Sequence, residues 1–339
     1  AASSSSTALA TGAVIVDPAG PVPPDSQAAR VVRETDTLIL TFESNGAEVS
    51  SIQLKEYRNT DGSPVELVLA GSSTERPFAL AFGDHLAAPV AFPFVLREYA
   101  DGARRMIEFS RALLSADGVP FTLKKTYVVM DGEYLVELRV AIESASNAAP
   151  ALGAGSLGYT LLVGPQIGPA FEKLDGRQDV RNFVYWAPDQ NKGKPKKELA
   201  TGGKTKNIEQ HFTWVGTVGK YFTLIAVPPA DATNFVLDSR VLVPGTIRSA
   251  LAFSRPAPRA ARTEDAWQFY AGPMKAEVME RYNASDDNGF GISGLKIDEA
   301  IDKPWALLRP IIWLMRLLME LFVKVIPNWG VSIILVTLV

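Results

Sequence analysis

Alternation of polar and apolar residues, interrupted by short glycine turns, constrains the fold of this chain more than any other feature of its sequence. In TLILTFE, the side chains of Leu38, Leu40 and Phe42 point to one side, and Asn45-Gly46 follows. A period of two is typical of strands with one buried face, and Asn-Gly favours a type I′ hairpin turn. Similar turn dipeptides recur at Asp61-Gly62, Asp101-Gly102, Asp117-Gly118, Asp131-Gly132 and Asp175-Gly176. The sequence therefore predicts antiparallel hairpins.

The clearest predicted hairpin joins FTLKKTYVVM to EYLVELRVAIE around Asp131-Gly132. In its second strand, every other residue from Tyr134 to Ile142 is apolar, opposite a face that carries Glu137 and Arg139. One buried and one wet face indicate a sheet that packs on a second sheet. No long helical pattern interrupts the strands, so we expect an all-β, antiparallel domain over residues 30–285 and not a doubly wound α/β fold.

The composition changes on both sides of this predicted β domain. Residues 1–29 are rich in Ala, Ser, Thr and Pro, which predicts a flexible linker. Residues 286–302 are expected to form a loop or short helix. From residue 303 the chain becomes strongly apolar, and 303–326 and 327–339 are predicted to form two further helical segments.

Segment 303–326 has the pattern of an amphipathic helix. Arg316, Glu320 and Lys324 follow one another at helical spacing and form a polar stripe among Leu, Ile, Met and Phe. Such a helix could pack on the sandwich as part of its core, or it could lie along the surface of a bilayer, where flanking Trp residues are typical. The second interpretation explains the polar stripe and the flanking Trp305 and Trp313 better. The residues expected at the membrane surface are Trp305, Arg309, Trp313, Arg316, Glu320, Lys324 and Trp329.

Segment 327–339 begins with NWG and continues as VSIILVTLV without a charge. Pro327 and Asn328 are typical of a helix start, and Trp329 suits the level of lipid headgroups. Only 15 residues run from Val325 to Val339, whereas a spanning helix needs roughly 20 apolar residues. The segment is therefore either a short buried helix or the start of a transmembrane helix that ends beyond this sequence, and we favour the second.

Several kinds of chemistry have little support in the sequence. The chain has no cysteine and only two histidines, His85 and His211, so a thiolate or multi-histidine metal site is excluded. Glu209 near His211 could serve acid/base chemistry, but a histidine at a strand end is the simpler explanation. The string GAGSLG precedes a strand pattern instead of a helix and does not indicate a nucleotide site. With a net charge of −3, no nucleic acid is expected, and we expect no catalytic residue, metal or cofactor.

At the C-terminal junction the sequence resembles a known family. KPWALLRPIIWLMRLLMELFVKVIPNWGVSIILVTLV is similar to the segment of bacterial YidC membrane insertases in which a periplasmic amphipathic helix leads through NWG into the second transmembrane helix. TDTLILTFESNGAEVSSIQLKEY, TLKKTYVVMDGEYLVELRV, WVGTVGKYFTLIAVPP and YAGPMK resemble further family segments in the same order. The resemblance covers about Val31 to Val339.

This resemblance implies a periplasmic β-super-sandwich similar to the galactose mutarotase fold, with a C-terminal amphipathic helix and a truncated transmembrane helix. A first transmembrane helix is expected before Ala1, and the insertase core, with its groove arginine, after Val339. The implied function is insertion and folding of integral membrane proteins in the bacterial inner membrane by a multi-pass protein that is not an enzyme. The implied partners are nascent membrane proteins, the lipid bilayer, and the Sec translocon with its accessory subunits.

A second interpretation comes from the same type of fold. A carbohydrate-binding or mutarotase-like, sugar-active protein could also be built on such a sandwich. It predicts aromatic platforms and a histidine with a carboxylate on one concave face, and two histidines give it little support.

Overall fold

The computed structural model describes two compact units, residues 1–300 and 301–339. The described residues are 15–16, 30–68, 77–152, 156–164, 181–187, 194–199, 204–232, 234–243, 246–302 and 309–338. The expected linker 1–29, apart from residues 15–16, lies outside them, as do Asp175-Gly176 and Trp305.

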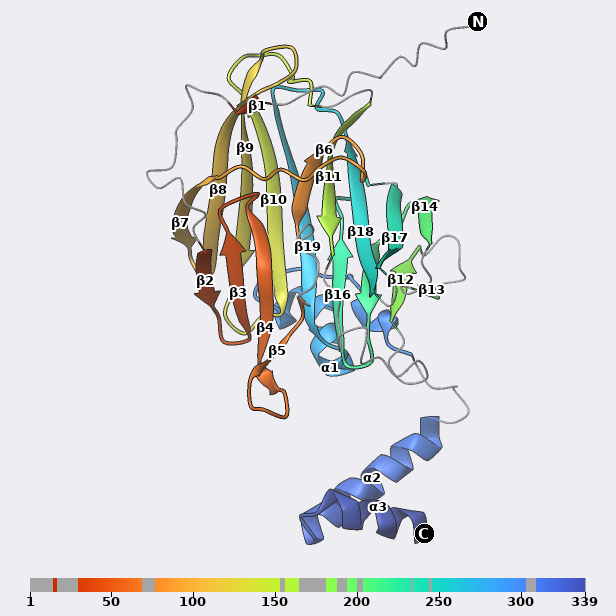
Figure 1. The fold of residues 1–339 in the computed structure, drawn as a ribbon. Coiled ribbons are helices and arrows are strands. Elements are labelled where there is room, and N and C mark those ends of the chain that lie inside the picture. Colours follow the sequence, from red (N-terminus) through yellow and green to blue (C-terminus); the bar gives the residue numbers. More distant parts are fainter. Residues whose placement is uncertain are drawn as a thin grey trace, which may run out of the picture. The chain divides into compact units, whose positions relative to one another are not determined.

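The first unit is built from three antiparallel sheets (Figure 1). The largest, with ten strands, runs in the order β1 (Ile15–Val16), β8 (Arg104–Leu114), β9 (Pro120–Val129), β10 (Leu135–Ser144), β19 (Arg262–Pro273), β16 (Phe222–Val227), β15 (Trp214–Val218), β12 (Asn182–Trp186) and β13 (Lys196–Leu199), and β7 (Val95–Asp101) also pairs with β8. The five-stranded sheet has the order β14 (Thr205–Glu209), β17 (Asn234–Val243), β18 (Thr246–Pro256), β11 (Leu157–Val163) and β6 (Ala79–Phe82). The four-stranded sheet has the order β2 (Arg30–Glu34), β3 (Leu38–Glu43), β4 (Glu48–Arg58) and β5 (Pro64–Glu66).

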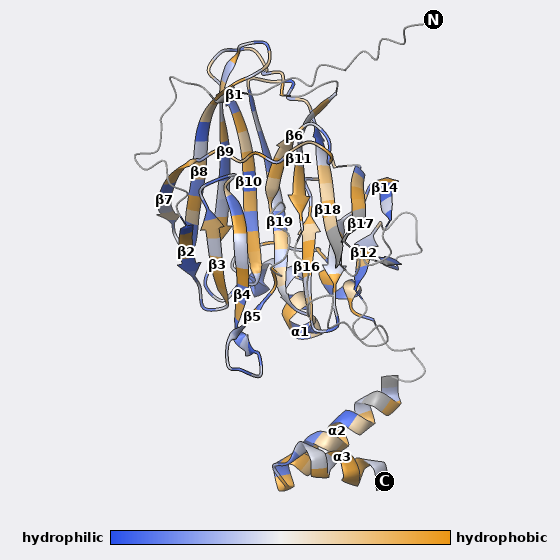
Figure 2. Cartoon of the chain, viewed as in Figure 1, coloured by the Kyte–Doolittle hydropathy of each residue, from blue (hydrophilic) through white to orange (hydrophobic). Residues whose placement is uncertain are grey.

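The two smaller sheets pack on the ten-stranded sheet through rings from both layers. Phe42 of β3 lies 4.9 Å from Tyr127 of β9, measured between ring centroids. On the other half of the sandwich, Phe253 of β18 lies 5.3 Å from Trp267 of β19. Figure 2 shows hydrophobic residues along the strands that form this interior, such as β10, β11 and β18. Because aromatic side chains bury a large apolar area each, these contacts hold the sheets together and confirm the predicted β-sandwich.

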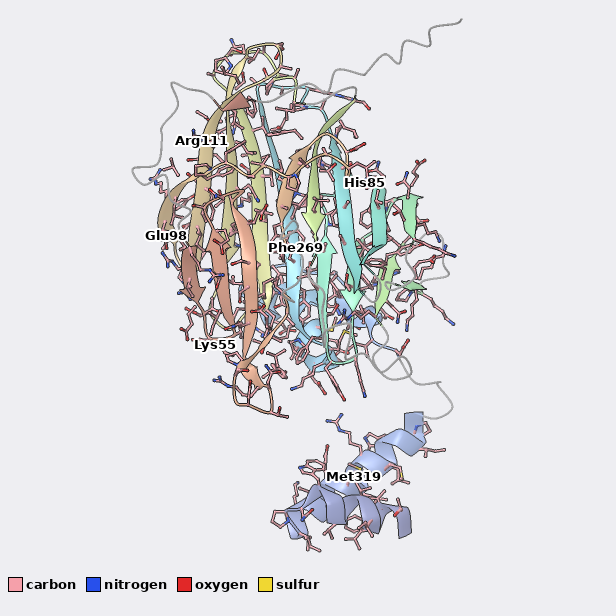
Figure 3. The ribbon with its side chains drawn as sticks, in the orientation of Figure 1. Lys55, His85, Glu98, Arg111, Phe269 and Met319 are labelled. Atoms are coloured by element: carbon pink, nitrogen blue, oxygen red, sulfur yellow. The ribbon has the colours of Figure 1, made fainter. Side chains whose placement is uncertain are left out.

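Polar contacts also join the layers at the outer strands. The guanidinium of Arg33 in β2 donates hydrogen bonds to both carboxylate oxygens of Glu98 in β7. Glu98 is labelled in Figure 3, as is Phe269 of β19, which is fully buried between the sheets. The Arg33–Glu98 pair therefore links an edge of the four-stranded sheet to an edge of the ten-stranded one.

The predicted hairpins that lie within the described residues are present, but their turns do not place positive φ at the predicted pairs of residues. Asp101 pairs with Arg104, so the two turn residues between β7 and β8 are Gly102 and Ala103. Of these, only Gly102 has a positive φ, at 60°. After β3, the positive φ angles belong to Gly46 and Ala47, not to Asn45. A type I′ turn needs positive φ at both central residues. The turn after β3 therefore meets this condition one residue later than predicted, at Gly46-Ala47, whereas the β7–β8 turn does not meet it.

Lys125 is a fully buried cation in the core of the sandwich. Its ammonium donates hydrogen bonds to the carbonyl oxygens of Gly46, Ala47 and Phe78, at 3.0, 2.6 and 2.6 Å. Ala47 and Phe78 both have positive φ, at 48° and 66°, a backbone region that non-glycine residues rarely adopt. The ammonium therefore fixes two unusual loop conformations under the sheet.

We expect Lys125 to make stability depend on pH. Burial lowers the pKa of its amine from 10.5 to about 7. Between these values the unfolded chain binds more protons than the folded one, so this group makes the free energy of unfolding rise with pH, by at most about 1.4 kcal/mol per unit. The measurement compares wild type and Lys125→Met by urea denaturation at several pH values in this window. Wild type should show the steeper rise, and equal slopes would contradict the assignment.

Short helices follow the last strand and belong to the first unit. They are α1 (Ala276–Met279), η2 (Glu280–Asn283), η3 (Ser285–Asp287) and η4 (Ile297–Ala300). Met279, Tyr282 and Ile297 are fully buried, and η4 packs against α1 and η2. Figure 1 shows these helices at one end of the sandwich, which we call the α1 end. The second unit contains α2 (Arg309–Val325) and α3 (Trp329–Leu338), which pack against each other.

Candidate functional site

The predicted polar stripe is present on α2. Arg316 and Glu320 form an ion pair at 3.0 Å, and both side chains are mostly exposed. Lys324 is also exposed and lies in the last turn, where a cation interacts favourably with the helix dipole. An exposed pair of this kind adds little stability. The stripe therefore serves mainly to keep one side of α2 in contact with water.

A second stripe on α2 is apolar and exposed. Leu314, Leu317, Leu321 and Val325 follow one another at helical spacing, and their exposed fractions run from 47% for Leu317 to 74% for Val325. Monomeric soluble proteins seldom expose a continuous apolar surface of this kind. The stripe is therefore the strongest candidate binding surface in the second unit.

Packing by α3 covers part of the apolar face of α2. In α3, Ser332 and Val336 are buried one turn apart, and the two helices contact each other. The half-buried residues of α2 are Leu318, Met319, Phe322 and Val323, and Met319 is labelled in Figure 3. The apolar residues next to the polar stripe stay exposed, and so do Ile311 and Met315 on the other side of α2.

The NWG sequence is a helix cap. The Asn328 side-chain oxygen accepts hydrogen bonds from the backbone N–H groups of Gly330 at 2.9 Å and Val331 at 3.3 Å. A side chain at Gly330 would bring its Cβ within 3.2 Å of that oxygen. Asn328 therefore satisfies two of the free N–H groups at the start of α3, and the predicted helix start is confirmed.

The structure places most of the expected membrane-surface residues on these two helices. Trp313 is 65% exposed and lies at helical spacing from Arg316, on the side of the polar stripe. Trp329, 59% exposed, begins α3. Arg309 begins α2. Among residues 309–338 and the other described parts of the chain, no helix is long and apolar enough to cross a membrane.

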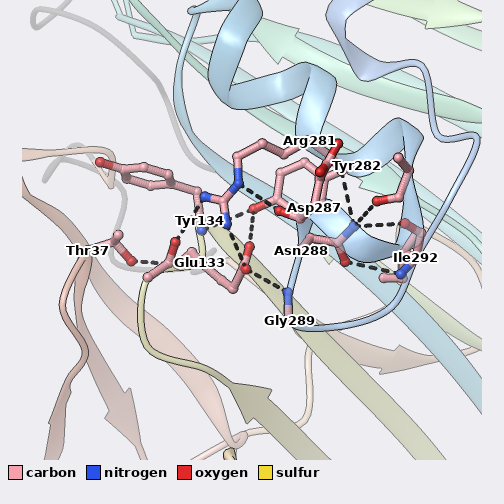
Figure 4. A network of polar contacts seen from close by, with 11 residues as sticks. Thr37, Glu133, Tyr134, Arg281, Tyr282, Asp287, Asn288, Gly289 and Ile292 are labelled. Carbon is pink, nitrogen blue, oxygen red and sulfur yellow. Dashed lines mark hydrogen bonds and ion pairs between the residues drawn. The ribbon is translucent and has the colours of Figure 1, made fainter.

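Sequence reasoning missed a buried network that ties the α1 end together (Figure 4). Glu133, in the turn between β9 and β10, is only 3% exposed. Its carboxylate accepts hydrogen bonds from the Tyr282 hydroxyl at 2.9 Å and the Gly289 N–H at 2.8 Å, and pairs with Arg281 at 3.1 Å. Burial raises the pKa of Tyr282, and the Glu133 charge raises it further. One carboxylate therefore holds the segment after α1 to a turn of the large sheet.

Asn288 orders the other half of this network. Its amide nitrogen donates to the carbonyl oxygens of Arg281, Ala284 and Ile292, at 3.1, 2.9 and 2.8 Å. Its side-chain oxygen accepts from the Ile292 N–H at 3.1 Å. A segment with little regular structure is thus fixed by one side chain, and the chain leaves the first unit from a rigid base.

Replacing Glu133 by Ala should lower the free energy of unfolding by about 3 kcal/mol, because it leaves the Arg281 charge, the Tyr282 hydroxyl and the Gly289 N–H without their acceptor. The matched control is Glu143→Ala, at the other end of β10, where the carboxylate is partly exposed and pairs with Lys124 and Arg262. That change should cost less than about 1 kcal/mol. Urea denaturation measures both, and equal losses would contradict a special role for Glu133.

A polar cavity of about 510 Å³ lies at the opposite end of β19, beside Arg255. The Arg255 guanidinium donates to Asp265 at 2.7 Å and to Asp231 at 2.8 Å, and the Tyr159 hydroxyl donates to Asp265 at 2.5 Å. Burial opposes the charge on Arg255, but the hydrogen bonds and charge of Asp265, together with Tyr159 and the hydrogen bond to Asp231, outweigh this and raise its pKa. Carboxylates beside a guanidinium could hydrogen-bond a polyhydroxylated ligand, although here they already bind one another.

The two histidines lie outside this cavity; His85 is half-buried and His211 is exposed. His85, labelled in Figure 3, follows β6, whereas His211 follows β14. Glu209 accepts a hydrogen bond from the Asn207 side chain at 2.9 Å. Within the described residues, no group of three or more metal-ligating side chains comes together.

Comparison with known proteins identifies the chain's relatives. The family model of the YidC periplasmic domain matches residues 30–314. Membrane protein insertase YidC of Treponema denticola is 32% identical over 316 residues, which cover 91% of this chain and 53% of that protein. The protein of the same name from Treponema pallidum is 30% identical over 364 residues, with 97% and 57% covered. This chain therefore spans about half the length of the curated relatives it matches.

A solved structure supports the fold assignment. A galactose mutarotase-like protein from Lactobacillus casei superimposes with a TM-score of 0.50 and 11% identity, covering 72% of this chain and 100% of that one. At this identity the similarity shows the fold alone, and it confirms the predicted mutarotase-like sandwich. The matched family model extends from β2 through the sandwich and the α1 end into α2. The chain belongs to the YidC periplasmic domain family.

Proposed function

We propose that this chain is the periplasmic part of an inner-membrane insertase that aids the insertion and folding of integral membrane proteins. The observation that carries the proposal is the family match over residues 30–314, which includes the start of α2. The relatives that share this region are membrane protein insertases. The insertase would be a multi-pass protein with the β domain in the periplasm.

In this proposal α2 lies along the membrane surface. Leu314, Leu317, Leu321 and Val325 enter the boundary between headgroups and acyl chains, while Arg316 and Glu320 remain in water. Trp313 and Lys324 border the apolar stripe, where a ring and a long ammonium side chain can reach the headgroups. The cap at Asn328 then turns the chain into α3, as the start of a transmembrane helix.

The insertion step would change no covalent bond, so we propose that the protein is not an enzyme and needs no cofactor. A membrane segment of a client protein lowers its free energy by moving its apolar residues into lipid, but its polar flank is costly to bury. The part of the insertase outside this chain would lower the free-energy cost of burying that polar flank. Its proposed partners are nascent membrane proteins and the Sec translocon with its accessory subunits.

Depletion of the full-length protein tests the insertase proposal. We expect small inner-membrane proteins to accumulate outside the membrane after depletion, as measured by protease protection of a labelled client. Expression of the full-length protein from a plasmid should restore insertion. Unchanged insertion after complete depletion would contradict the proposal.

The mutarotase-like fold and the cavity beside Arg255 favour a second candidate, a carbohydrate-binding role. Isothermal titration with simple hexoses tests it. Saturable binding that is lost in Asp231→Asn, but retained when the distant Glu209 is changed to Gln, would support this role. Absence of heat from binding at millimolar hexose would exclude it for these sugars.

A further inference from the structure

Two lysine–tyrosine pairs lie at the α1 end of the sandwich. Tyr221, in the turn between β15 and β16, is 63% exposed, and the Lys220 ammonium lies 5.1 Å from the centre of its ring. The Lys275 ammonium lies 5.0 Å from the centre of the Tyr57 ring, and that ring packs edge-on against Phe222 at 5.3 Å. We call Tyr57, Lys220, Tyr221 and Lys275 the exit surface.

Hydrogen bonds join the strands that carry this surface. The Met274 N–H donates to the Tyr221 carbonyl at 2.8 Å, which connects the end of β19 to the β15–β16 turn. The Tyr134 hydroxyl donates to Glu56, next to Tyr57, at 2.7 Å. Tyr134 follows Glu133, whose carboxylate holds the segment after α1. The exit surface and the base from which the chain leaves the first unit are therefore parts of one ordered end.

We propose that the exit surface is a second membrane contact, made by the β domain itself with the headgroups of the same leaflet that holds α2. The inference rests on the proposed function, because it needs α2 at the bilayer. Tyrosine combines an apolar ring with a polar tip, and lysine a long apolar stem with a charge, so both suit the headgroup layer. Lys220 and Lys275 are exposed and can meet lipid phosphates.

The length of the connection between the two units supports this contact. Six residues, 303–308, separate Asp302 from Arg309, and a chain of this length spans at most about 25 Å. A chain of this length would allow the α1 end to reach the headgroups when α2 lies in the interface. Covalent attachment also raises the local concentration of the surface at the bilayer, so a weak contact can be occupied.

The charge on the exit surface is not purely basic. A hydrogen bond with Tyr57 raises the pKa of Lys275, and the nearby charges of Glu56 and Glu277 raise it further. Attraction to anionic lipid therefore depends on Lys220 and Lys275 together with the two rings. A protein partner for the same surface is the alternative, and it would not require lipid.

Fluorescent labels test the contact, because a chain without cysteine accepts a single labelling site. An environment-sensitive dye is attached at Thr60→Cys beside the exit surface, at Ala116→Cys in the β8–β9 turn at the other end of the sandwich, or at Leu321→Cys on α2. The whole chain is mixed with phosphatidylcholine vesicles that contain phosphatidylglycerol. We expect the dye to brighten and shift to the blue at positions 321 and 60, but not at 116.

The outcomes separate this inference from the proposed function. A response at 321 with none at 60 overturns the membrane contact of the β domain and leaves the membrane placement of α2 intact. No response at 321 contradicts the placement of α2, and the exit-surface contact with it. Equal responses at 60 and 116 indicate nonspecific adsorption and also overturn the inference.

Charge removal provides a second test. Lys220→Gln with Lys275→Gln should weaken partition of the chain into these vesicles, by about fivefold for each lysine, and reduce the dye response at position 60. The matched control is Arg259→Gln with Arg262→Gln. Arg259 precedes β19 and Arg262 begins it, whereas Lys275 follows the other end of this strand. It should change partition less than twofold. Equal effects of the two pairs would contradict a specific exit surface.

Discussion

Replacing both Leu317 and Leu321 by Asp is expected to weaken binding of the chain to phosphatidylcholine vesicles by about 100-fold or more. Both leucines lie in the middle of the exposed stripe of α2. Burying one leucine side chain contributes about 1.5–3 kcal/mol, and an Asp at the same place adds an unfavourable term. Flotation of the chain with vesicles measures the loss. Zwitterionic lipid is used so that the added negative charges do not themselves repel the surface.

The control for this prediction changes the polar stripe of the same helix. Arg316→Gln with Glu320→Gln removes the ion pair without placing a charge on the apolar side, and binding should change less than threefold. Urea denaturation should show the same stability of the β domain in both double variants. Unchanged vesicle binding of the Leu317→Asp, Leu321→Asp variant would contradict the interfacial placement of α2.

Replacing Lys125 by Ala is expected to lower the free energy of unfolding by about 4 kcal/mol. The change leaves a cavity in the core and removes the donor for the carbonyl oxygens of Gly46, Ala47 and Phe78. All three carbonyls belong to residues with positive φ, so the loops that the Lys125 ammonium fixes should also loosen.

The adjacent lysine is the natural control. Lys124 is partly exposed and pairs with Glu143 at 2.6 Å. Lys124→Ala should therefore cost less than about 1 kcal/mol. Urea denaturation of both variants distinguishes the two lysines, and a similar cost for both would show that the buried ammonium contributes little.

The local sequence pattern was sufficient to predict the strands and helices of this fold, but not which of them pair or pack with one another. The alternation in β9 and β10 predicted their hairpin, and the register pairs Leu138 with Tyr127 across it. The same alternation could have located the buried cation, because Phe121, Leu123, Lys125 and Tyr127 share one face of β9. Because a lysine is rarely buried, the KK of FTLKKTYVVM gave no such indication.

The wet face predicted for β10 is less open than expected. Leu135 and Ala141 are buried on it, and Glu137 is only 9% exposed. Glu137 pairs with Arg139 at 2.6 Å, so the two charges on this face neutralise each other. β10 lies between β9 and β19 within the ten-stranded sheet, and a central strand is more covered than its own sequence pattern indicates.

The network at Glu133 could not be predicted from local pattern. Its partners Arg281, Tyr282 and Gly289 lie about 150 residues away along the chain, and no periodicity connects such distant positions. The α2–α3 junction is the opposite case. Its polar stripe, helix break and Asn cap are set by neighbouring residues, so the sequence alone predicted them.

The most direct test of the account is a scan of α2 with single spin labels at residues 310–325, one cysteine at a time, on vesicles. Oxygen dissolves in lipid and a nickel complex stays in water, so the ratio of their collision rates reports depth. The account predicts a ratio with a helical period, high at Leu314, Leu317, Leu321 and Val325 and low at Arg316 and Glu320. A ratio that stays low along the whole helix, with nickel reaching the leucines as readily as Glu320, would contradict the placement of α2 in the membrane interface.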